Sequence, residues 1–264
     1  MRWHGQWVRG ALVAALLVLG VAVFSGCNLS PSNGGGGTEA AYNLVVVLER
    51  NLELKQDIVY LRFRHENKGI AGGVVIIDGD TIPTLPASGQ GTKTYSPGRW
   101  IYQQMLQIKA LDAANSYAYR DSIRLPSSFE ITNVIPPNHL WQGGNVTLTW
   151  TPALDADDYF ISVKPRTVGS SARGLGRYDT DSDPLSETFP GTEAFANTFG
   201  TVIADVYDMQ IVAYSRNFTL RPNAPYKAPD TDDIRDPISR TDIDGAICAL
   251  MVSARDTILV PQTF

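Results

Sequence analysis

The sequence predicts an all-β chain made of two tandem β-sandwiches, preceded by a signal helix and a flexible linker. Two observations carry this prediction. From residue 42 onward, runs rich in β-branched and aromatic residues are separated by glycine, proline and aspartate, the pattern of strands joined by turns. No apolar repeat of helical period interrupts these runs for a useful length. The chain has 264 residues, 44% of them hydrophobic and 19% charged, which is enough to bury a core.

Residues 1–26 have the composition of a secretory signal. Arg2, His4 and Arg9 precede Gly10–Phe24, a run of 15 residues without a polar or charged side chain. A helix that crosses the roughly 30 Å hydrocarbon core of a bilayer needs about 20 residues, so this run is short for a permanent span. A basic start, a short apolar run and small residues before a cleavage site predict a signal that is removed.

The residues Phe24-Ser25-Gly26-Cys27 resemble the lipobox of bacterial lipoproteins, with Phe24 where that family more often has leucine. The resemblance implies a diacylglycerol on the Cys27 thiol, cleavage before Cys27, and usually a third acyl chain such as palmitate. Two or more chains hold a protein stably at a membrane. The next residue, Asn28, is not acidic, which by the same resemblance favours the outer membrane. We therefore expect a lipid-anchored, extracytoplasmic protein of the bacterial cell envelope. A secreted protein with an incidental cysteine and an uncleaved signal anchor are the alternatives.

Residues 27–40 are rich in glycine and serine, which predicts a flexible linker between the lipid and the folded part. The chain has two cysteines, Cys27 and Cys248. If Cys27 is acylated, Cys248 has no partner for an intramolecular disulfide. Cys248 lies in the apolar run Ala246–Val252, where we expect a buried thiol that packs as a small hydrophobic side chain.

Residues 41–126 predict an immunoglobulin-like sandwich of about seven short strands. Leu44–Leu48 is apolar and β-branched, and Ile58–Arg64 alternates between an apolar and a mixed face. Asp78-Gly79 between two apolar runs is a strong signal for a tight hairpin. The last strand of this module is expected over Tyr117–Leu125.

Residues 127–264 predict a second sandwich. Trp150 ends one alternating run, a short acidic turn follows, and Tyr159 lies in the next apolar run; Tyr207 opens a later alternating run. Over roughly residues 128–221 this arrangement resembles a fibronectin type III domain. The resemblance implies that Trp150 fills the core and that the Tyr207 hydroxyl bonds back to nearby backbone at a corner.

A loop rich in proline and aspartate, residues 222–244, is expected within the second module. Apolar residues return at Ala246–Val252 and Ile258–Val260. Because about twenty residues cannot bury a core of their own, we expect both runs to be strands that complete the second sandwich.

The acidic clusters are the candidate ion sites. Asp179, Asp181 and Asp183 alternate like the first ligands of a calcium loop. An EF-hand loop needs glycine at its sixth position and glutamate at its twelfth, and this chain has proline at both. A looser calcium site with Glu187 as a further ligand stays open, beside a solvated loop. A second acidic cluster, expected to be a solvated turn, comprises Asp155, Asp157 and Asp158.

Other chemistry finds little support in the sequence. The two histidines beyond the signal, His65 and His139, have no metal-binding spacing, and no G-x-S-x-G nucleophile motif occurs. We therefore expect no enzymatic activity and no resident cofactor apart from the calcium alternative. Trp100 and Trp141 are candidates for stacking on sugar rings or anchoring a peptide if they are exposed, and core residues otherwise. A net charge of −5 argues against a nucleic-acid partner.

These patterns favour a non-catalytic, membrane-anchored lipoprotein whose sandwiches bind or space another envelope protein or a glycan. The alternative is a carbohydrate-associated protein, binding or hydrolytic, with a calcium-supported loop. A sandwich fold does not decide between them, because sandwiches host many unrelated functions.

Overall fold

The computed structural model describes residues 42–100, 104–114, 118–179, 185–216, 224–227, 229 and 243–262. Ala40–Phe264 forms one compact unit. The predicted signal (1–26), the predicted lipidation site Cys27, the linker and most of the loop 222–244 lie outside the described residues. Within the described residues, no helix is long and apolar enough to cross a membrane.

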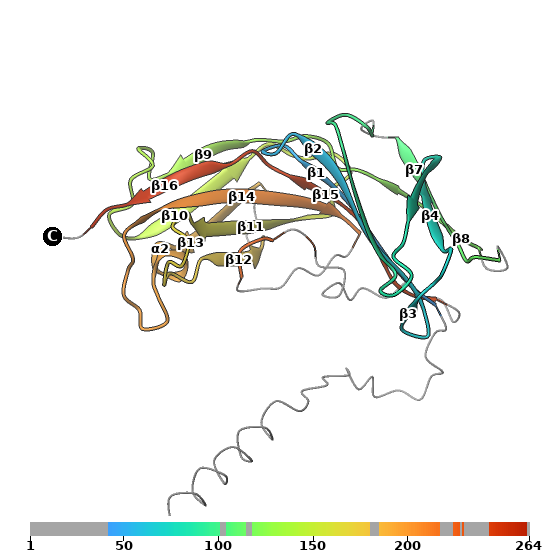
Figure 1. Cartoon of the computed structure of the whole chain (residues 1–264). Coiled ribbons are helices and arrows are strands. Elements are labelled where there is room, and N and C mark those ends of the chain that lie inside the picture. Colours follow the sequence, from blue (N-terminus) through green and yellow to red (C-terminus); the bar gives the residue numbers. More distant parts are fainter. Residues whose placement is uncertain are drawn as a thin grey trace, which may run out of the picture. The chain divides into compact units, whose positions relative to one another are not determined.

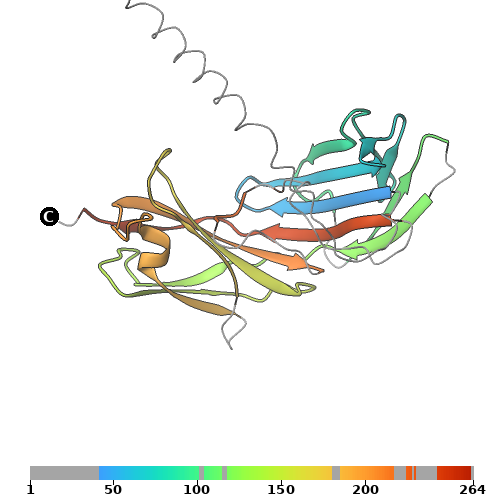
Figure 2. The same cartoon turned by 90° about the horizontal axis from the view of Figure 1, so that it is seen from below.

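The strands of the described part of the chain form three sheets (Figures 1 and 2). Sheet A contains β1 (Tyr42–Asn51), β2 (Gln56–His65), β3 (Lys68–Gly69), β6 (Gln90–Tyr95), β11 (Asp158–Pro165), β12 (Leu175–Tyr178), β14 (Asp205–Ser215), β15 (Ile243–Val252) and β16 (Asp256–Val260). Sheet B contains β4 (Val74–Ile77), β5 (Asp80–Pro83), β7 (Met105–Leu111) and β8 (Ala118–Arg124). Sheet C contains β9 (Ile131–Ile135), β10 (Asn145–Trp150) and β13 (Ser186–Pro190), after which comes the short helix α2 (Gly191–Phe195).

Sheet A is one layer of both sandwiches. Its β1–β2 half packs against sheet B, and its β11–β14 half packs against sheet C (Figure 1). The predicted all-β, sandwich-built fold is therefore confirmed. The boundary between the two modules near residue 126 stays a prediction, because sheet A runs without interruption from one half to the other.

Strand β15 joins the two halves. It pairs in parallel with β1 along its whole length, from Tyr42 opposite Ile243 to Asn51 opposite Val252. At its far end it also pairs antiparallel with β14, between Val212 opposite Val252 and Ser215 opposite Ala249. The expectation that Ala246–Val252, now part of β15, completes the second sandwich is corrected. Most of the pairing of β15 is with β1, the first strand of the first sandwich. Strand β16 pairs with β14, as expected for the second sandwich.

The position of β1 and β15 explains their continuous apolar sequences. Leu44, Val46 and Leu48 face the core between the sheets, whereas Val45 and Val47 face the other side of sheet A, and all five are fully buried. Strands buried on both faces read as unbroken hydrophobic runs rather than alternating ones. Cys248 on β15 is 2% exposed, so the predicted buried thiol is confirmed.

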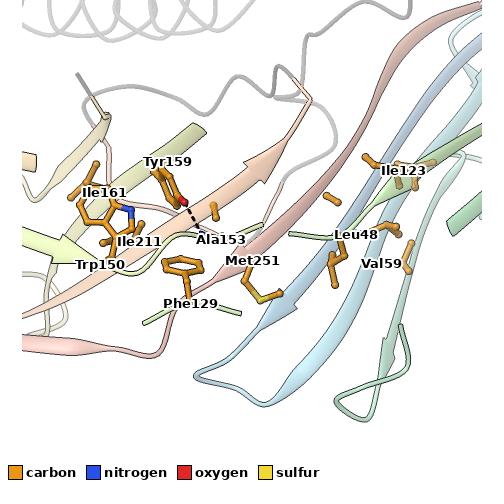
Figure 3. Close-up of a cluster of buried hydrophobic side chains, with 14 of the residues drawn as sticks. Leu48, Val59, Ile123, Phe129, Trp150, Ala153, Tyr159, Ile161, Ile211 and Met251 are labelled. Atoms are coloured by element: carbon orange, nitrogen blue, oxygen red, sulfur yellow. Dashed lines mark hydrogen bonds between the residues drawn. The ribbon is translucent and has the colours of Figure 1, made fainter. Parts of the chain in front are cut away.

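The core between the sheets continues from one half to the other. Figure 3 shows Met251 of β15 between Leu48 of the first half and Phe129 of the second. Both halves belong to one cluster of buried hydrophobic side chains. The two sandwiches therefore share a hydrophobic core as well as a sheet.

Several local predictions are confirmed. Asp78 and Gly79 have φ values of 48° and 81° and join β4 to β5 with Ile77 opposite Asp80, as the primed turn of a hairpin requires. Trp150 is buried, with its ring 5.3 Å from that of Tyr159.

Tyr207 forms the corner that the fibronectin type III resemblance implies. Its hydroxyl donates to the backbone oxygen of Ile203 at 2.8 Å, and lies 3.2 Å from that of Phe195.

The close approach of β15 to β1 depends on Gly245. This residue has φ of 139°, and a Cβ there would overlap the Leu44 backbone oxygen.

We predict that Gly245→Ala lowers the free energy of unfolding by about 3 kcal/mol, because it adds overlap to backbone strain. Gly79→Ala is the control, since its φ of 81° is also positive but its Cβ would meet nothing within 4 Å. It should cost roughly 1 kcal/mol. Equal losses in urea unfolding would contradict a tight β1–β15 contact.

Candidate functional site

The two histidines have structural contacts. The His65 ring lies 4.6 Å from that of Tyr42, and His139 Nδ1 lies 3.1 Å from an Asp256 carboxylate oxygen and 2.9 Å from the Thr257 backbone oxygen. Across the described ranges, no group of three or more histidine, cysteine, aspartate or glutamate residues could hold a metal ion.

Trp100 lies in the core of the first sandwich, 2% exposed, with its ring edge-on to Tyr95 at 5.4 Å. Its backbone oxygen accepts a 2.6 Å hydrogen bond from the Arg50 guanidinium. That guanidinium also makes two bonds, of 2.6 and 2.8 Å, to the fully buried Asp57 carboxylate. Breaking a buried, hydrogen-bonded ion pair of this kind costs about 3–5 kcal/mol, so the segment around Trp100 is firmly held.

Trp141 is 7% exposed and packs inside the second sandwich, edge-on to Phe195 at 5.2 Å. Its indole nitrogen donates to the Gly144 backbone oxygen at 3.1 Å. Gly191 starts α2 directly against this ring and has no room for a Cβ. The hypothesis that Trp100 and Trp141 offer exposed rings to a sugar or peptide is therefore corrected, since both are core residues.

The proposed calcium ligands are only partly described. Asp181 and Asp183 lie outside the described residues, and the Asp179 backbone amide donates to the Tyr159 backbone oxygen at 3.0 Å. Glu187 is fully buried, and its Oε1 lies 2.9 Å from Arg177 Nε. The contact of this oxygen is electrostatic rather than an aligned hydrogen bond. Glu187 thus already has a cationic partner, and a calcium site at Asp179, Asp181 and Asp183 stays a prediction.

The second acidic cluster lies where the two halves of the molecule meet. Arg216, at the end of β14, donates to both Asp121 carboxylate oxygens at 2.7 and 3.0 Å, and its backbone amide donates to Asp157. Arg124 of β8 reaches Asp155 at 3.4 Å. Burial alone would raise the pKa of Asp121, but the hydrogen bonds and charge of Arg216, together with hydrogen bonds from the Ser122 amide and Tyr119, lower that pKa overall. The expected solvated turn is therefore part of a polar junction between β8 and the second sandwich.

The outer face of sheet A holds a buried carboxylate that the sequence analysis missed. Glu49 of β1 is 1% exposed; one oxygen accepts from the Tyr226 hydroxyl at 2.8 Å and the other from Asn51 at 3.0 Å. Tyr60 is a third donor. In the sequence, Glu49 directly follows the apolar run Leu44–Leu48, where a polar residue is typical of a strand end. Its burial is explained by another segment of the chain that covers this face of the sheet.

That segment is residues 224–227, called the strap below. The Tyr226 backbone amide donates to the Ser162 hydroxyl at 2.8 Å. Neither of two glycines beneath the strap has space for a side chain. Pro225 lies against Gly174, just before β12, and the Ala224 backbone oxygen lies against Gly176, within β12. The strap therefore packs closely on sheet A, beside the cluster formed by Val47, Phe160, Cys248 and their neighbours.

Burial raises the pKa of Glu49, although hydrogen bonds from Asn51, Tyr226 and Tyr60 each lower it. Burial and the nearby Glu49 charge together raise the pKa of Tyr226 well above its ordinary value. The tyrosine is therefore a neutral donor at physiological pH, and Glu49 is a weaker acid than an exposed glutamate. The contact is a proton-sensitive part of the packing on this face.

No family model matches this sequence, and no curated protein matches it. Among solved structures, the chain is similar to the "Crystal structure of chicken CNTN1 FN1-FN3 domains", with 8% sequence identity and a TM-score of 0.25. The match covers 82% of this chain and 64% of that one, so the chain spans less than two thirds of that structure's length. A TM-score this low supports no argument about function.

The raised pKa of Glu49 gives a pH-dependent prediction. Folding favours its protonated form, so its contribution to stability is complete below the ordinary pKa of 4.5 and is lost as pH rises through the raised folded value. Glu49→Gln removes this loss, so the variant should gain stability relative to the natural chain as pH rises from about 4 to 8.

Tyr226→Phe should act in the opposite direction. It removes a donor to the ionised carboxylate, so it should cost about 1–3 kcal/mol at neutral pH and less in acid. Urea unfolding measured across this pH range separates the two variants. Parallel pH profiles for all three proteins would show that the Glu49 contact with the strap does not form.

Proposed function

We propose that this chain is a non-catalytic lipoprotein of the bacterial cell envelope, anchored through Cys27, whose two sandwiches form one stiff unit for spacing or display. The observation that carries the proposal is the double pairing of β15 with β1 and β14. A strand shared by both halves resists bending between them, whereas two domains joined by a short linker move relative to each other by default.

The dimensions fit a spacer. Tyr42, where the chain enters sheet A, and Asp205, at the start of β14, lie at opposite ends of the path through β1, β15 and β14. About 17 residues of strand separate them along this path, or roughly 50 Å at about 3.3 Å per residue. A flexible linker, predicted from the composition of residues 27–40, lets the stiff body reach away from an anchoring membrane while keeping its own geometry.

Polar contacts at the junction support the same proposal. The Arg216–Asp121 contact is bidentate, and the Ser215 hydroxyl donates to the Arg124 backbone oxygen at 3.0 Å. Partly exposed pairs contribute little stability individually, about 0–1 kcal/mol. Their effect is directional, since they fix the angle between β8 and the second sandwich. The partner, whether an envelope protein or a glycan, is part of the proposal and has no assigned site.

Metabolic labelling tests the anchor. Cells expressing the natural chain and fed radiolabelled palmitate should yield a labelled protein in the membrane fraction, because acyl chains on Cys27 partition into lipid. Cys27→Ser should abolish the label and release the protein. Cys248→Ser is the matched control and should keep both label and location, because Cys248 is buried within sheet A.

Label on the Cys27→Ser chain, or an unlabelled natural chain, would contradict the anchor. Turnover of a glycan or peptide that one substitution abolishes would contradict the non-catalytic part of the proposal.

A further inference from the structure

Two loops at one end of the second sandwich present apolar side chains to solvent. Val168, between β11 and β12, is fully exposed, and Phe199, between α2 and β14, is 91% exposed. Both loops lie near the end of sheet A where β14 starts and β16 ends (Figures 1 and 2). Single exposed apolar side chains are common on protein surfaces, so the informative feature here is that two of them lie on loops joined by hydrogen bonds.

The Phe199 loop is a fixed turn. The Asn197 side-chain oxygen accepts from the Phe199 amide at 2.9 Å and from the Thr201 amide at 3.0 Å. The Asn197 backbone amide donates to the Thr201 backbone oxygen at 2.9 Å, and Gly200 supplies the positive φ of 82°. With its backbone held by these bonds, the turn keeps the phenyl ring projecting outward.

Hydrogen bonds also hold the Val168 loop, and they join it to the first turn. Thr167 donates through its amide and hydroxyl to the Asp205 carboxylate at 3.2 and 3.0 Å. The Arg173 amide donates to the Ala196 oxygen at 3.1 Å, and the Arg173 guanidinium donates to the Thr198 oxygen at 2.9 Å. The two tips are therefore parts of one hydrogen-bonded surface, called the tip surface below.

The Val168 loop is the basic part of the tip surface, and the acidic residue of this surface, Asp205, accepts hydrogen bonds from Thr167. Residues 164–174 contain Lys164, Arg166 and Arg173 and no acidic residue. Arg166 is paired with Asp208 at 2.6 Å. Within the part of the chain that the structure describes, Lys164 and Arg173 are exposed and have no carboxylate in ion-pair range.

From this combination we infer that the tip surface docks on an anionic lipid bilayer, with Val168 and Phe199 entering the interface and Lys164 and Arg173 contacting headgroup phosphates. Apolar and aromatic groups that reach a few ångströms into the headgroup region bind through buried apolar area together with attraction to anionic lipid. Each cation near such a surface adds about 1 kcal/mol.

A lipid surface fits the tip surface better than a protein partner does. Two projecting side chains offer about 300 Å² of apolar area, whereas a stable protein interface buries roughly 800 Å² on each partner. A bilayer needs no complementary pocket, and its phosphates match the charges of Lys164 and Arg173, which no carboxylate of the described residues pairs. The inference stands apart from the proposed Cys27 anchor, because the tip surface lies at the end of sheet A remote from Tyr42.

Vesicle binding without acylation tests this inference. The protein is the chain from residue 28 onward, which retains the compact unit Ala40–Phe264. The probes are vesicles of equal parts phosphatidylglycerol and phosphatidylcholine, and vesicles of phosphatidylcholine alone. We expect sedimentation with the anionic vesicles, weaker binding to the neutral ones, and loss of the difference at high salt.

Substitutions locate the contact. Val168→Ser with Phe199→Ser should weaken partition into anionic vesicles by about tenfold or more. Lys164→Gln with Arg173→Gln should weaken it by a similar factor and flatten the salt dependence. Leu85→Ser is the matched control, since Leu85 is 62% exposed in the loop between β5 and β6. It should change partition by less than about twofold. Unchanged melting temperatures show that all variants fold.

Two results would overturn the inference. One is no binding to anionic vesicles, or equal binding by the natural chain and the Val168→Ser, Phe199→Ser variant. The other is a photoreactive residue at position 199 that, in envelope membranes, crosslinks to a protein and forms no lipid adduct. Failure here leaves the palmitate result at Cys27 unaffected, so the two proposals can fail separately.

Discussion

The pairing of β15 with both β1 and β14 is the constraint on which the rest of this structure depends. Ten residues of parallel ladder bind the C-terminal region to the first strand of the fold, and the end of the same strand continues into the second sandwich. With β15 in place, β1 has neighbours on both sides and both faces of the strand pair must be covered. Sheet B covers one face, and the strap covers part of the other, around Glu49.

Close backbone approach is needed wherever these layers meet, and glycine provides it. Gly245 lets β15 lie against β1, and Gly174 and Gly176 let the strap lie against β12. Two carboxylates buried in these layers have hydrogen-bond donors. Asp57 is bonded to Arg50, and Glu49 is bonded to Tyr226 and Asn51. A buried polar group without partners would cost about 1–3 kcal/mol, so these pairings determine whether the packed faces are stable.

Local features of the fold could be predicted from the sequence because they depend on neighbouring residues. The Asp78-Gly79 hairpin, the Tyr207 corner and the burial of Cys248 follow from short patterns. The pairing of β15 could not be derived in this way, since about 200 residues separate it from β1. One signal was present, because Leu44–Leu48 and Ala246–Val252 are both unbroken apolar runs, which are typical of strands buried on two faces.

The predicted sites were less well placed than the fold. Whether Trp100 and Trp141 are exposed depends on the sheets packed around them. The alternation of apolar and polar residues in the sequence carries no information on how sheets pack. The acidic residues near Asp157 form a junction because Arg124, about 30 residues earlier, and Arg216, about 60 residues later, reach them. The exposed pair Val168 and Phe199 lay in segments whose sequence shows no motif, and hydrogen bonds within and between the two loops bring them to one end of the sandwich.

A stiff spacer or display unit requires that its two halves unfold together as one cooperative unit rather than separately. Native-state hydrogen exchange tests this most directly, by comparing protected amides in β1, β15 and β14. If β15 locks the halves together, all three strands should exchange with free energies that agree within about 1 kcal/mol and fall together in denaturant. If β14 opens at a much lower free energy while β1 stays protected, the halves are independent domains and the account of a single stiff unit is wrong.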